Sequence, residues 1–152
     1  MKGFITKMIS RLSGEVNLVK FWNLREKIIK KNNKLMLPIY YLKYQKVLTK
    51  CGAGIPINTE FKNMPTFPHS LYGIFISTGA KIGANCVIFH QVTIGSNTLP
   101  SSKKQGAPII GDNCFIGVGA KIIGGVKIGD NVWIGANCVV TEDVPDNCTV
   151  VL

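Results

Sequence analysis

Aliphatic residues recur every six positions along most of the second half of this chain. They are Ile76, Ile82, Ile88, Ile94, Ile110, Ile116, Ile122, Ile128, Ile134 and Val140. The one irregular step in this series, between residues 94 and 110, is one repeat plus ten extra residues. A fixed period of this kind is typical of solenoids, in which each repeat stacks on its neighbours.

The other positions of the repeat predict short strands joined by tight turns. Four residues after each aliphatic position stands a small or β-branched residue, and the residue before that one is Gly or Asn in seven of eight repeats. Gly and Asn tolerate the positive φ of a left-handed turn. A period of six fits a strand with alternating faces followed by a fixed turn, whereas an α-helix has a period of about 3.6. We therefore predict a parallel β-helix whose aliphatic and small positions point inward.

The N-terminal third differs from the repeats in charge and in pattern. Residues 1–50 contain twelve Lys or Arg and two Glu, whereas residues 51–152 contain equal numbers of basic and acidic residues. Apolar residues recur near helical spacing from about residue 15 to residue 32 and from about residue 34 to residue 50, where Pro38 allows a break or a kink. We predict a basic helical segment over residues 1–51 and a β-helix domain over residues 52–152.

The basic segment is compatible with two roles. Its helices can cover the open N-terminal end of the solenoid and help subunits associate, because an exposed solenoid end needs a cap. Alternatively, it is a basic amphipathic segment that rests on an anionic membrane surface. Nucleic-acid binding is a weaker third reading, since no recognised motif accompanies the charge, and we expect no nucleic-acid partner.

The sequence also limits the compartment. No apolar run reaches the ~18 residues needed to span a bilayer. The five Cys include no CxxC pair, and Cys86, Cys114 and Cys138 fall at the small inward position of the repeat, where a thiol acts as a small apolar group. We expect reduced structural cysteines in a cytoplasmic protein.

Three departures from the repeat mark candidate functional residues. A step of nine residues contains His69, the repeat with Gln91 at its turn contains His90, and the ten-residue insertion carries Lys103 and Lys104. The two histidines occupy equivalent places in their repeats, separated by three hexads plus a three-residue slip. If a coil takes three hexads, the two imidazoles lie close together on successive coils. Histidine, with an ordinary pKa near 6.5, is suited to act as a base at neutral pH.

Two runs of the sequence resemble the hexapeptide-repeat acyltransferases, in particular their serine acetyltransferase-like branch. One is PHSLYGIFISTGAKIGANCVIFHQVTIG, in which a His precedes a Gly-Ile pair and VTIG closes the next coil; the other is GAPIIGDNCFIGVGAKIIGGVKIGDNVWIGANCVV, similar to the family's cofactor-binding coils. The resemblance covers about residues 52–150. It implies a left-handed parallel β-helix with three hexads per coil, a homotrimer, and acetyl-coenzyme A as acyl donor in the groove between subunits, with no metal.

The resemblance also implies roles for individual residues. His69 matches the family's catalytic base, which takes the proton of an acceptor hydroxyl as that hydroxyl attacks the acetyl thioester. His90 is expected to orient His69 or to bind the acceptor. The cofactor-binding candidates are Gly117, Val118, Trp133, Gly135 and Ala136, with Lys103 and Lys104 for the cofactor's phosphates. The small residues among them also serve the repeat, and lysines on a loop are commonly only solvated.

Several side chains expected in the family are missing. The Asp that orients the catalytic His would align near Gly54, the acidic residue before that His is Pro68, and Gly106-Ala107 replaces the Arg-His pair that engages serine. The chain therefore lacks most groups that would recognise an amino acid. It shares this departure with relatives that resemble capsule or exopolysaccharide acetyltransferases.

We therefore expect acetyl transfer to a sugar hydroxyl, either on a small molecule or on a lipid-linked glycan that membrane contact through residues 1–50 would bring within reach. Serine O-acetylation and a non-catalytic hexapeptide-repeat scaffold are the alternatives. A carbonic anhydrase of the γ type shares the architecture and needs three zinc-binding histidines at each site. The chain has two, and a neighbouring subunit could supply the third, but the sequence lacks the supporting acidic spacing.

Overall fold

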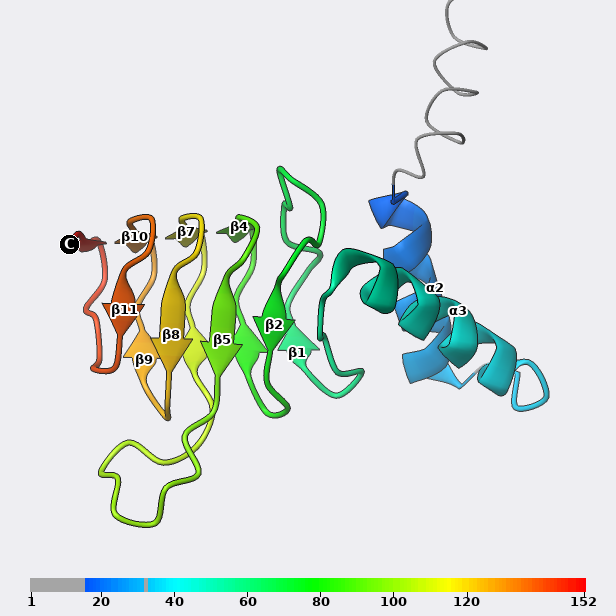
Figure 1. Ribbon diagram of the computed structural model, residues 1–152, viewed down its shortest axis with the longest axis horizontal. Helices are drawn as coiled ribbons and strands as arrows, with labels where there is room; N and C mark the ends of the chain where they lie inside the picture. The colour runs from blue at the N-terminus through cyan, green and yellow to red at the C-terminus, as the bar shows by residue number, and fades with distance from the viewer. Residues whose placement is uncertain (1–15, 32) are drawn as a thin grey trace, which may run out of the picture. The chain divides into compact units, whose positions relative to one another are not determined.

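The computed structural model describes residues 16–31 and 33–152, so residues 1–15 of the basic segment lie outside the described part of the chain. The chain divides into two compact units between Val47 and Leu48. The first consists of helices and the second of short strands (Figure 1).

Two helices make up the N-terminal part, α2 over Leu18–Lys30 and α3 over Leu37–Cys51. The side chain of Asn17 caps α2 by accepting the backbone N–H of Lys20 at 2.9 Å. Pro38 is the second residue of α3, in the first turn, where its missing N–H leaves no helical hydrogen bond unmade. Pro38 therefore helps to begin the second helix and does not interrupt it.

Aromatic and charged side chains pack between these helices. The rings of Phe21 and Tyr44 stack with their centroids 4.7 Å apart. Both side chains are buried, and burial raises the pKa of Tyr44 to about 12. Arg25 is buried beside them and lies over the Trp22 ring at 5.1 Å. None of the helices in the described residues is long and apolar enough to cross a membrane.

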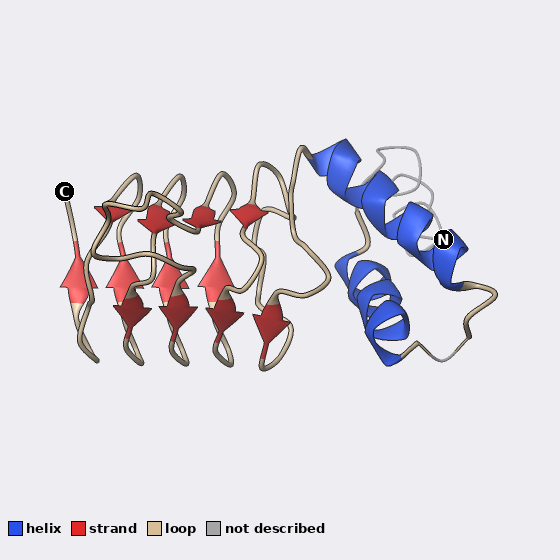
Figure 2. Ribbon diagram, turned by 90° about the horizontal axis from the view of Figure 1, so that it is seen from below, coloured by secondary structure: helices blue, strands red, loops and turns tan. Residues whose placement is uncertain are grey.

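The second unit is a parallel β-helix, as the repeat predicts, and it is left-handed, as the family resemblance implies. Its strands are β1 (Glu60–Phe61), β2 (Phe75–Ile76), β3 (Lys81–Ile82), β4 (Val87–Ile88), β5 (Thr93–Gly95), β6 (Ile109–Ile110), β7 (Phe115–Ile116), β8 (Lys121–Ile123), β9 (Lys127–Ile128), β10 (Trp133–Ile134), β11 (Val139–Val140) and β12 (Thr149–Val150). They form three parallel sheets in the orders β1-β3-β6-β9, β12-β10-β7-β4 and β11-β8-β5-β2. Figure 2 shows the strands stacked in rows along the solenoid.

The strand register confirms coils of three hexads, except that the last coil is two residues shorter, since Trp133 pairs with Thr149. Phe75 pairs with Thr93, and Lys121 pairs with Val139, in each case exactly three hexads further along the chain. From Thr93 to its partner Lys121 the separation also includes the ten-residue insertion. From Thr66 to its partner Val87 it includes the three-residue slip, in the coils that hold the two histidines. The departures from the period therefore change the length of the turns and leave the stacking of strands intact.

The inward positions of the repeat form one continuous core. The ten aliphatic residues of the repeat are all 5% exposed or less. Cys86, Cys114 and Cys138 fill small inward positions, as predicted, and are buried free thiols. The hydrogen bond with the Cys114 thiol, together with burial, raises the pKa of Cys86.

Left-handed turns follow the predicted positions with two exceptions. Asn85, for example, has a φ of 57°. Gln91, expected to break the rule, also has a positive φ of 60°, because its side chain packs over Gly73 and its N–H donates to the Tyr72 carbonyl at 2.9 Å. The second exception is at Gly124, which has the positive φ expected of Gly125. The insertion causes this shift, since the Gly125 N–H donates to a carbonyl of that loop at 2.9 Å.

Candidate active site

The two histidines lie next to each other at one edge of the β-helix. The ring centroids of His69 and His90 are 4.9 Å apart, with the rings inclined at 66°. Thr66 and Val87 are paired in register, so the residues three positions later occupy the same place in successive coils. The proximity predicted from the spacing of the two histidines is therefore confirmed.

The slip of three residues after His69 is taken up by compact turns. The Ser70 N–H donates to the Phe67 carbonyl and the Ile74 N–H to the Leu71 carbonyl, both at 3.1 Å. Ser70 has a φ of 58°, whereas Leu71 and Ile74 are fully buried. The extra residues thus anchor the turn in the core, and His69 stays exposed at its start.

His90 is more enclosed than His69. It is half-buried, and its backbone carbonyl accepts the N–H of Gly119 from the next coil at 3.1 Å. Its Nδ1 atom is buried and has no hydrogen-bond partner among the described residues. A buried ring nitrogen without a partner costs free energy unless a ligand or a neighbouring group uses it.

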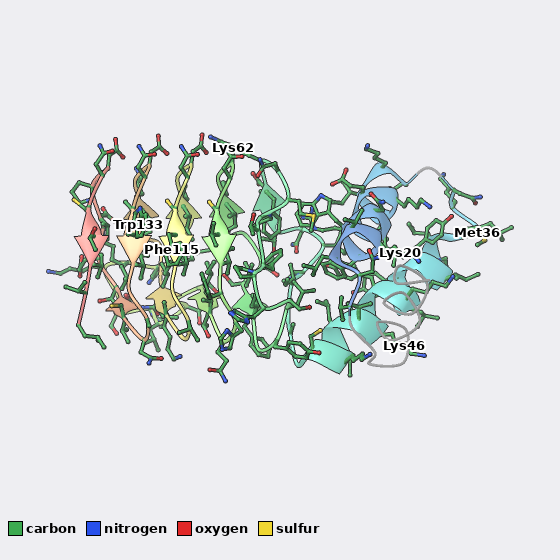
Figure 3. The ribbon with its side chains drawn as sticks, turned by 90° about the horizontal axis from the view of Figure 1, so that it is seen from above. Lys20, Met36, Lys46, Lys62, Phe115 and Trp133 are labelled. Atoms are coloured by element: carbon green, nitrogen blue, oxygen red, sulfur yellow. The ribbon has the colours of Figure 1, made fainter. Side chains whose placement is uncertain are left out.

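An aromatic row runs from the histidines along the outside of the β12-β10-β7-β4 sheet. The centroid of His69 is 5.6 Å from that of Phe89, Phe89 is 5.1 Å from Phe115, and Phe115 stacks on Trp133 at 5.1 Å. Figure 3 shows Phe115 and Trp133 side by side on neighbouring coils. Trp133 is 58% exposed, so the far end of the row is open to a ligand.

The sequence reasoning singled out Trp133 but missed Phe89 and Phe115. One signal could have found Phe115, because it stands three hexads before Trp133 at the same outward position of the repeat.

The small residues assigned to the cofactor lie on the edge that carries the histidines. Gly117 and Val118 follow β7, and Gly135 and Ala136 follow β10, in the same turn of successive coils. By register, His69, His90, Val118 and Ala136 hold equivalent places in four consecutive coils. The Gly117 N–H donates to the Ile134 carbonyl and the Asn137 N–H to the Val118 carbonyl, both at 2.8 Å.

The insertion lysines are not brought to the histidines within one chain. Lys103 and Lys104 lie between β5 and β6, at the turn between the β11-β8-β5-β2 and β1-β3-β6-β9 sheets. The histidines lie at a different edge. The Lys104 ammonium pairs with the Asp143 carboxylate at 2.8 Å, and its hydrogen bond lowers the pKa of that carboxyl. Lys103 is exposed.

The space beside Gly54 is filled by an aromatic ring. A Cβ placed on Gly54 would come within 2.8 Å of the Phe75 ring. An Asp could not occupy this position unless the ring moved. In this structure the phenyl group takes up the space in which the resemblance leads one to expect a carboxylate.

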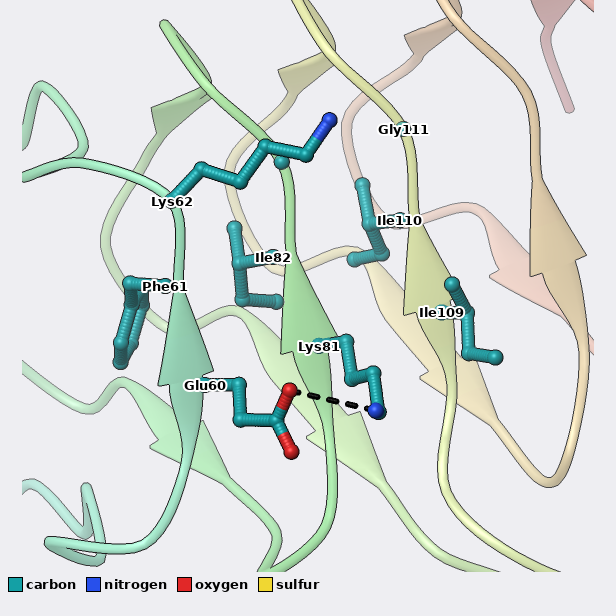
Figure 4. A pocket seen from close by; sticks show the side chains of 9 residues that line it. Glu60, Phe61, Lys62, Lys81, Ile82, Ile109, Ile110 and Gly111 are labelled. Atoms are coloured by element: carbon teal, nitrogen blue, oxygen red, sulfur yellow. Dashed lines mark ion pairs between the residues drawn. The ribbon is translucent and has the colours of Figure 1, made fainter.

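A groove of ≈ 320 Å³ lies on another sheet, along the outside of β1, β3 and β6 (Figure 4). Glu60 and Lys81 form an ion pair across it at 3.1 Å, and neither histidine lines it. The described residues contain no group of three or more His, Cys, Asp or Glu placed to hold a metal ion.

The fold and its period define a hexapeptide-repeat β-helix protein, and comparison with known proteins agrees. Residues 109–142 match the family model described as the hexapeptide repeat of succinyl-transferase. The chain is 43% identical to a serine acetyltransferase of Synechococcus elongatus over 79 residues, and this aligned segment makes up 52% of this chain and 32% of that protein. It is 40% identical over 79 residues to a serine acetyltransferase of Mycobacterium tuberculosis, and the aligned segment makes up 52% of this chain and 34% of that protein.

Solved structures show the same likeness. The serine acetyltransferase of Neisseria gonorrhoeae superposes with a TM-score of 0.68 at 27% identity, covering 87% of this chain and 50% of that one. Isoform 3 from Entamoeba histolytica, in complex with cysteine, gives a TM-score of 0.62 at 33% identity, covering 71% and 37%. The chain spans about a third of the length of the curated relatives it matches.

Proposed function

We propose that this protein is an acetyl-coenzyme A-dependent O-acetyltransferase with His69 as its general base. The observation that carries the proposal is the edge on which His69 and His90 stand 4.9 Å apart, in line with the small residues at 118 and 136. The serine acetyltransferase names of the relatives support the same reaction type.

In the proposed reaction, an acceptor hydroxyl attacks the carbonyl carbon of the acetyl thioester while the His69 ring takes the hydroxyl proton. Collapse of the tetrahedral intermediate breaks the C–S bond, and the imidazolium returns the proton to the leaving thiolate. A positioned base of this kind contributes typically a hundred- to ten-thousand-fold in rate. His90, packed edge-on against His69, holds that ring in place or contacts the acceptor.

The donor would lie along the edge formed by Gly117, Val118, Gly135 and Ala136. Small side chains there let an extended pantetheine arm approach the backbone closely. The exposed face of Trp133 offers an aromatic surface at the end of the row. We also propose a homotrimer with the donor between subunits, as the family resemblance implies. In that arrangement Lys103 of a neighbouring copy is a candidate for the phosphates, whereas Lys104 is held by Asp143.

Serine is the first candidate acceptor, because the named relatives are serine acetyltransferases. A sugar hydroxyl is the second. It is favoured by two positions at which the family resemblance leads one to expect an Asp and a His for the amino acid: these hold Gly54, with the Phe75 ring beside it, and Ala107. An exposed aromatic ring such as Phe75 also suits the apolar face of a sugar better than a zwitterion.

An assay of free thiol release from acetyl-coenzyme A decides between these acceptors. Serine is compared with a panel of hexoses and N-acetylhexosamines, and a reaction without acceptor measures hydrolysis. Turnover with serine alone supports serine acetylation, and turnover with a sugar alone supports the second candidate. No release above hydrolysis with any acceptor would overturn the enzyme proposal in favour of a scaffold.

A further inference from the structure

The helical part of the chain presents apolar side chains to solvent. Leu35, in the turn before α3, is 85% exposed, and Leu42 on α3 is 69% exposed. Ile39 lies between them and is also exposed. Ile39 and Leu42 are three positions apart on α3, so their side chains share one side of that helix, and Leu35 is exposed two residues before the helix begins. We call Leu35, Ile39 and Leu42 the apolar stripe.

The apolar stripe is not needed to hold the two helices together. The side of α3 that packs inward carries Tyr44, which is fully buried and stacks on Phe21. Residues 42 and 44 are about 200° apart around a helix, so the stripe faces away from this contact. The stripe is therefore a surface without a partner in the described residues of the helical unit.

Lysines surround the apolar stripe. Lys34 precedes it, Lys43 follows it directly, and Lys46 lies one turn further along α3; all three are exposed. Figure 3 shows Lys46 and, on α2, Lys20. Residues 16–47 hold eight Lys or Arg and one Glu. The exposed cations of this described segment are all lysines, because its one arginine is buried.

We propose that the apolar stripe and its lysines dock on an anionic lipid surface. In such a contact the leucines enter the boundary between headgroups and acyl chains, and the lysines lie among the lipid phosphates. Each lysine near such a surface strengthens binding by about fivefold. This proposal goes beyond the transfer reaction and does not depend on it.

Two other occupants fit the surface less well. A second copy of the same surface would bring two strongly positive segments together, which like-charge repulsion opposes. A nucleic acid would leave Leu35 and Leu42 without a role, and the surface lacks exposed Arg for bidentate contacts to phosphates or bases.

Vesicle co-sedimentation of the full chain tests the proposal. The probes are vesicles of phosphatidylcholine alone and of equal parts phosphatidylcholine and phosphatidylglycerol, at low ionic strength. We expect binding to the anionic vesicles only. Lys43→Gln/Lys46→Gln should weaken it about 25-fold. The matched control, Lys81→Gln/Lys127→Gln, removes the same charge from the β-helix and should bind within about twofold of the wild type.

The apolar contribution is tested by Leu35→Ser/Leu42→Ser, with far-UV circular dichroism to show that the helices form. This variant should also lose most of its binding, because the lysines alone do not anchor the helix. Three results would each overturn the proposal: no binding of the wild type to anionic vesicles, an equal loss in the control pair, or unchanged binding of the serine variant. Binding to duplex DNA that the serine substitutions leave unaltered, without vesicle binding, would assign the surface to nucleic acid.

Discussion

Replacement of Gly117 by Ala tests how closely the coils of the proposed donor edge are stacked. A Cβ at this position would lie 2.8 Å from the Ala136 nitrogen and 2.9 Å from both the Gly135 carbonyl carbon and the Ile134 oxygen. All three atoms belong to the backbone of the next coil, so no side chain can rotate away. The coils must separate locally to admit the methyl group.

That separation strains two hydrogen bonds between the coils. They run from the Gly117 N–H to the Ile134 carbonyl and from the Asn137 N–H to the Val118 carbonyl, each 2.8 Å long. Overpacking costs about 1–3 kcal/mol, and a weakened hydrogen bond costs about 0.5–1.5 kcal/mol. We expect Gly117→Ala to lower the free energy of unfolding by about 2–4 kcal/mol.

The matched control is Gly95→Ala. A Cβ there meets the Cδ1 atom of Ile123 at 3.0 Å, which is the far end of a flexible side chain. Neither Gly117 nor Gly95 has a positive φ, and both substitutions restrict the unfolded chain equally. The control should therefore lose about 1 kcal/mol or less. Urea unfolding followed by far-UV circular dichroism measures both variants. Equal midpoints for the two would refute the close stacking at residue 117.

Individual contacts lead to three further predictions. The Asp112 carboxylate accepts from Lys62 at 2.7 Å and from a backbone N–H, which lowers the pKa of that carboxyl below its ordinary 3.8. The ionised carboxylate contributes its full stabilisation above the ordinary pKa, and this contribution is lost as the pH falls through the lower pKa of the folded state. The urea midpoints of Asp112→Asn and the wild type should therefore differ at neutral pH and converge in acid. Equal midpoints at neutral pH would contradict this. Asn113 has a φ of 57°, and its side-chain amide donates to the Asn131 side chain at 3.2 Å. Asn113→Ala should therefore lower the free energy of unfolding by about 1–2 kcal/mol more than Asn113→Gly, because Gly tolerates a left-handed turn. The reverse order in urea unfolding would be incompatible with such a turn. If Trp133 stacks on the donor, Trp133→Ala should raise KM for acetyl-coenzyme A with little change in kcat, whereas an unchanged KM would remove it from the donor site.

The spacing of residues predicted most of the second unit. A period of six implies which side chains point inward, because alternation within a short strand and a fixed turn leave no other arrangement. The proximity of His69 and His90 followed from counting alone, since a coil of three hexads places the two residues in register once the slip is included.

Features that depend on contacts between distant segments could not be read from the period. The positive φ of Gln91 is stabilised by packing on Gly73, and the shift of the left-handed turn to Gly124 depends on the insertion folding back against it. The pairing of Lys104 with Asp143 likewise joins the insertion to a turn two coils later in the sequence. The ring of Phe75 over Gly54 was not foreseen either, because Gly54 was recognised only as a missing Asp.

The assignment of His69 as the base is tested most directly by His69→Ala in the thiol-release assay with the acceptor that the wild type uses. Circular dichroism and an unchanged urea midpoint would show that this variant is folded, as expected for an exposed side chain. We predict that kcat falls by about a hundred- to ten-thousand-fold while acetyl-coenzyme A still binds. Turnover by His69→Ala at the wild-type rate would contradict the account.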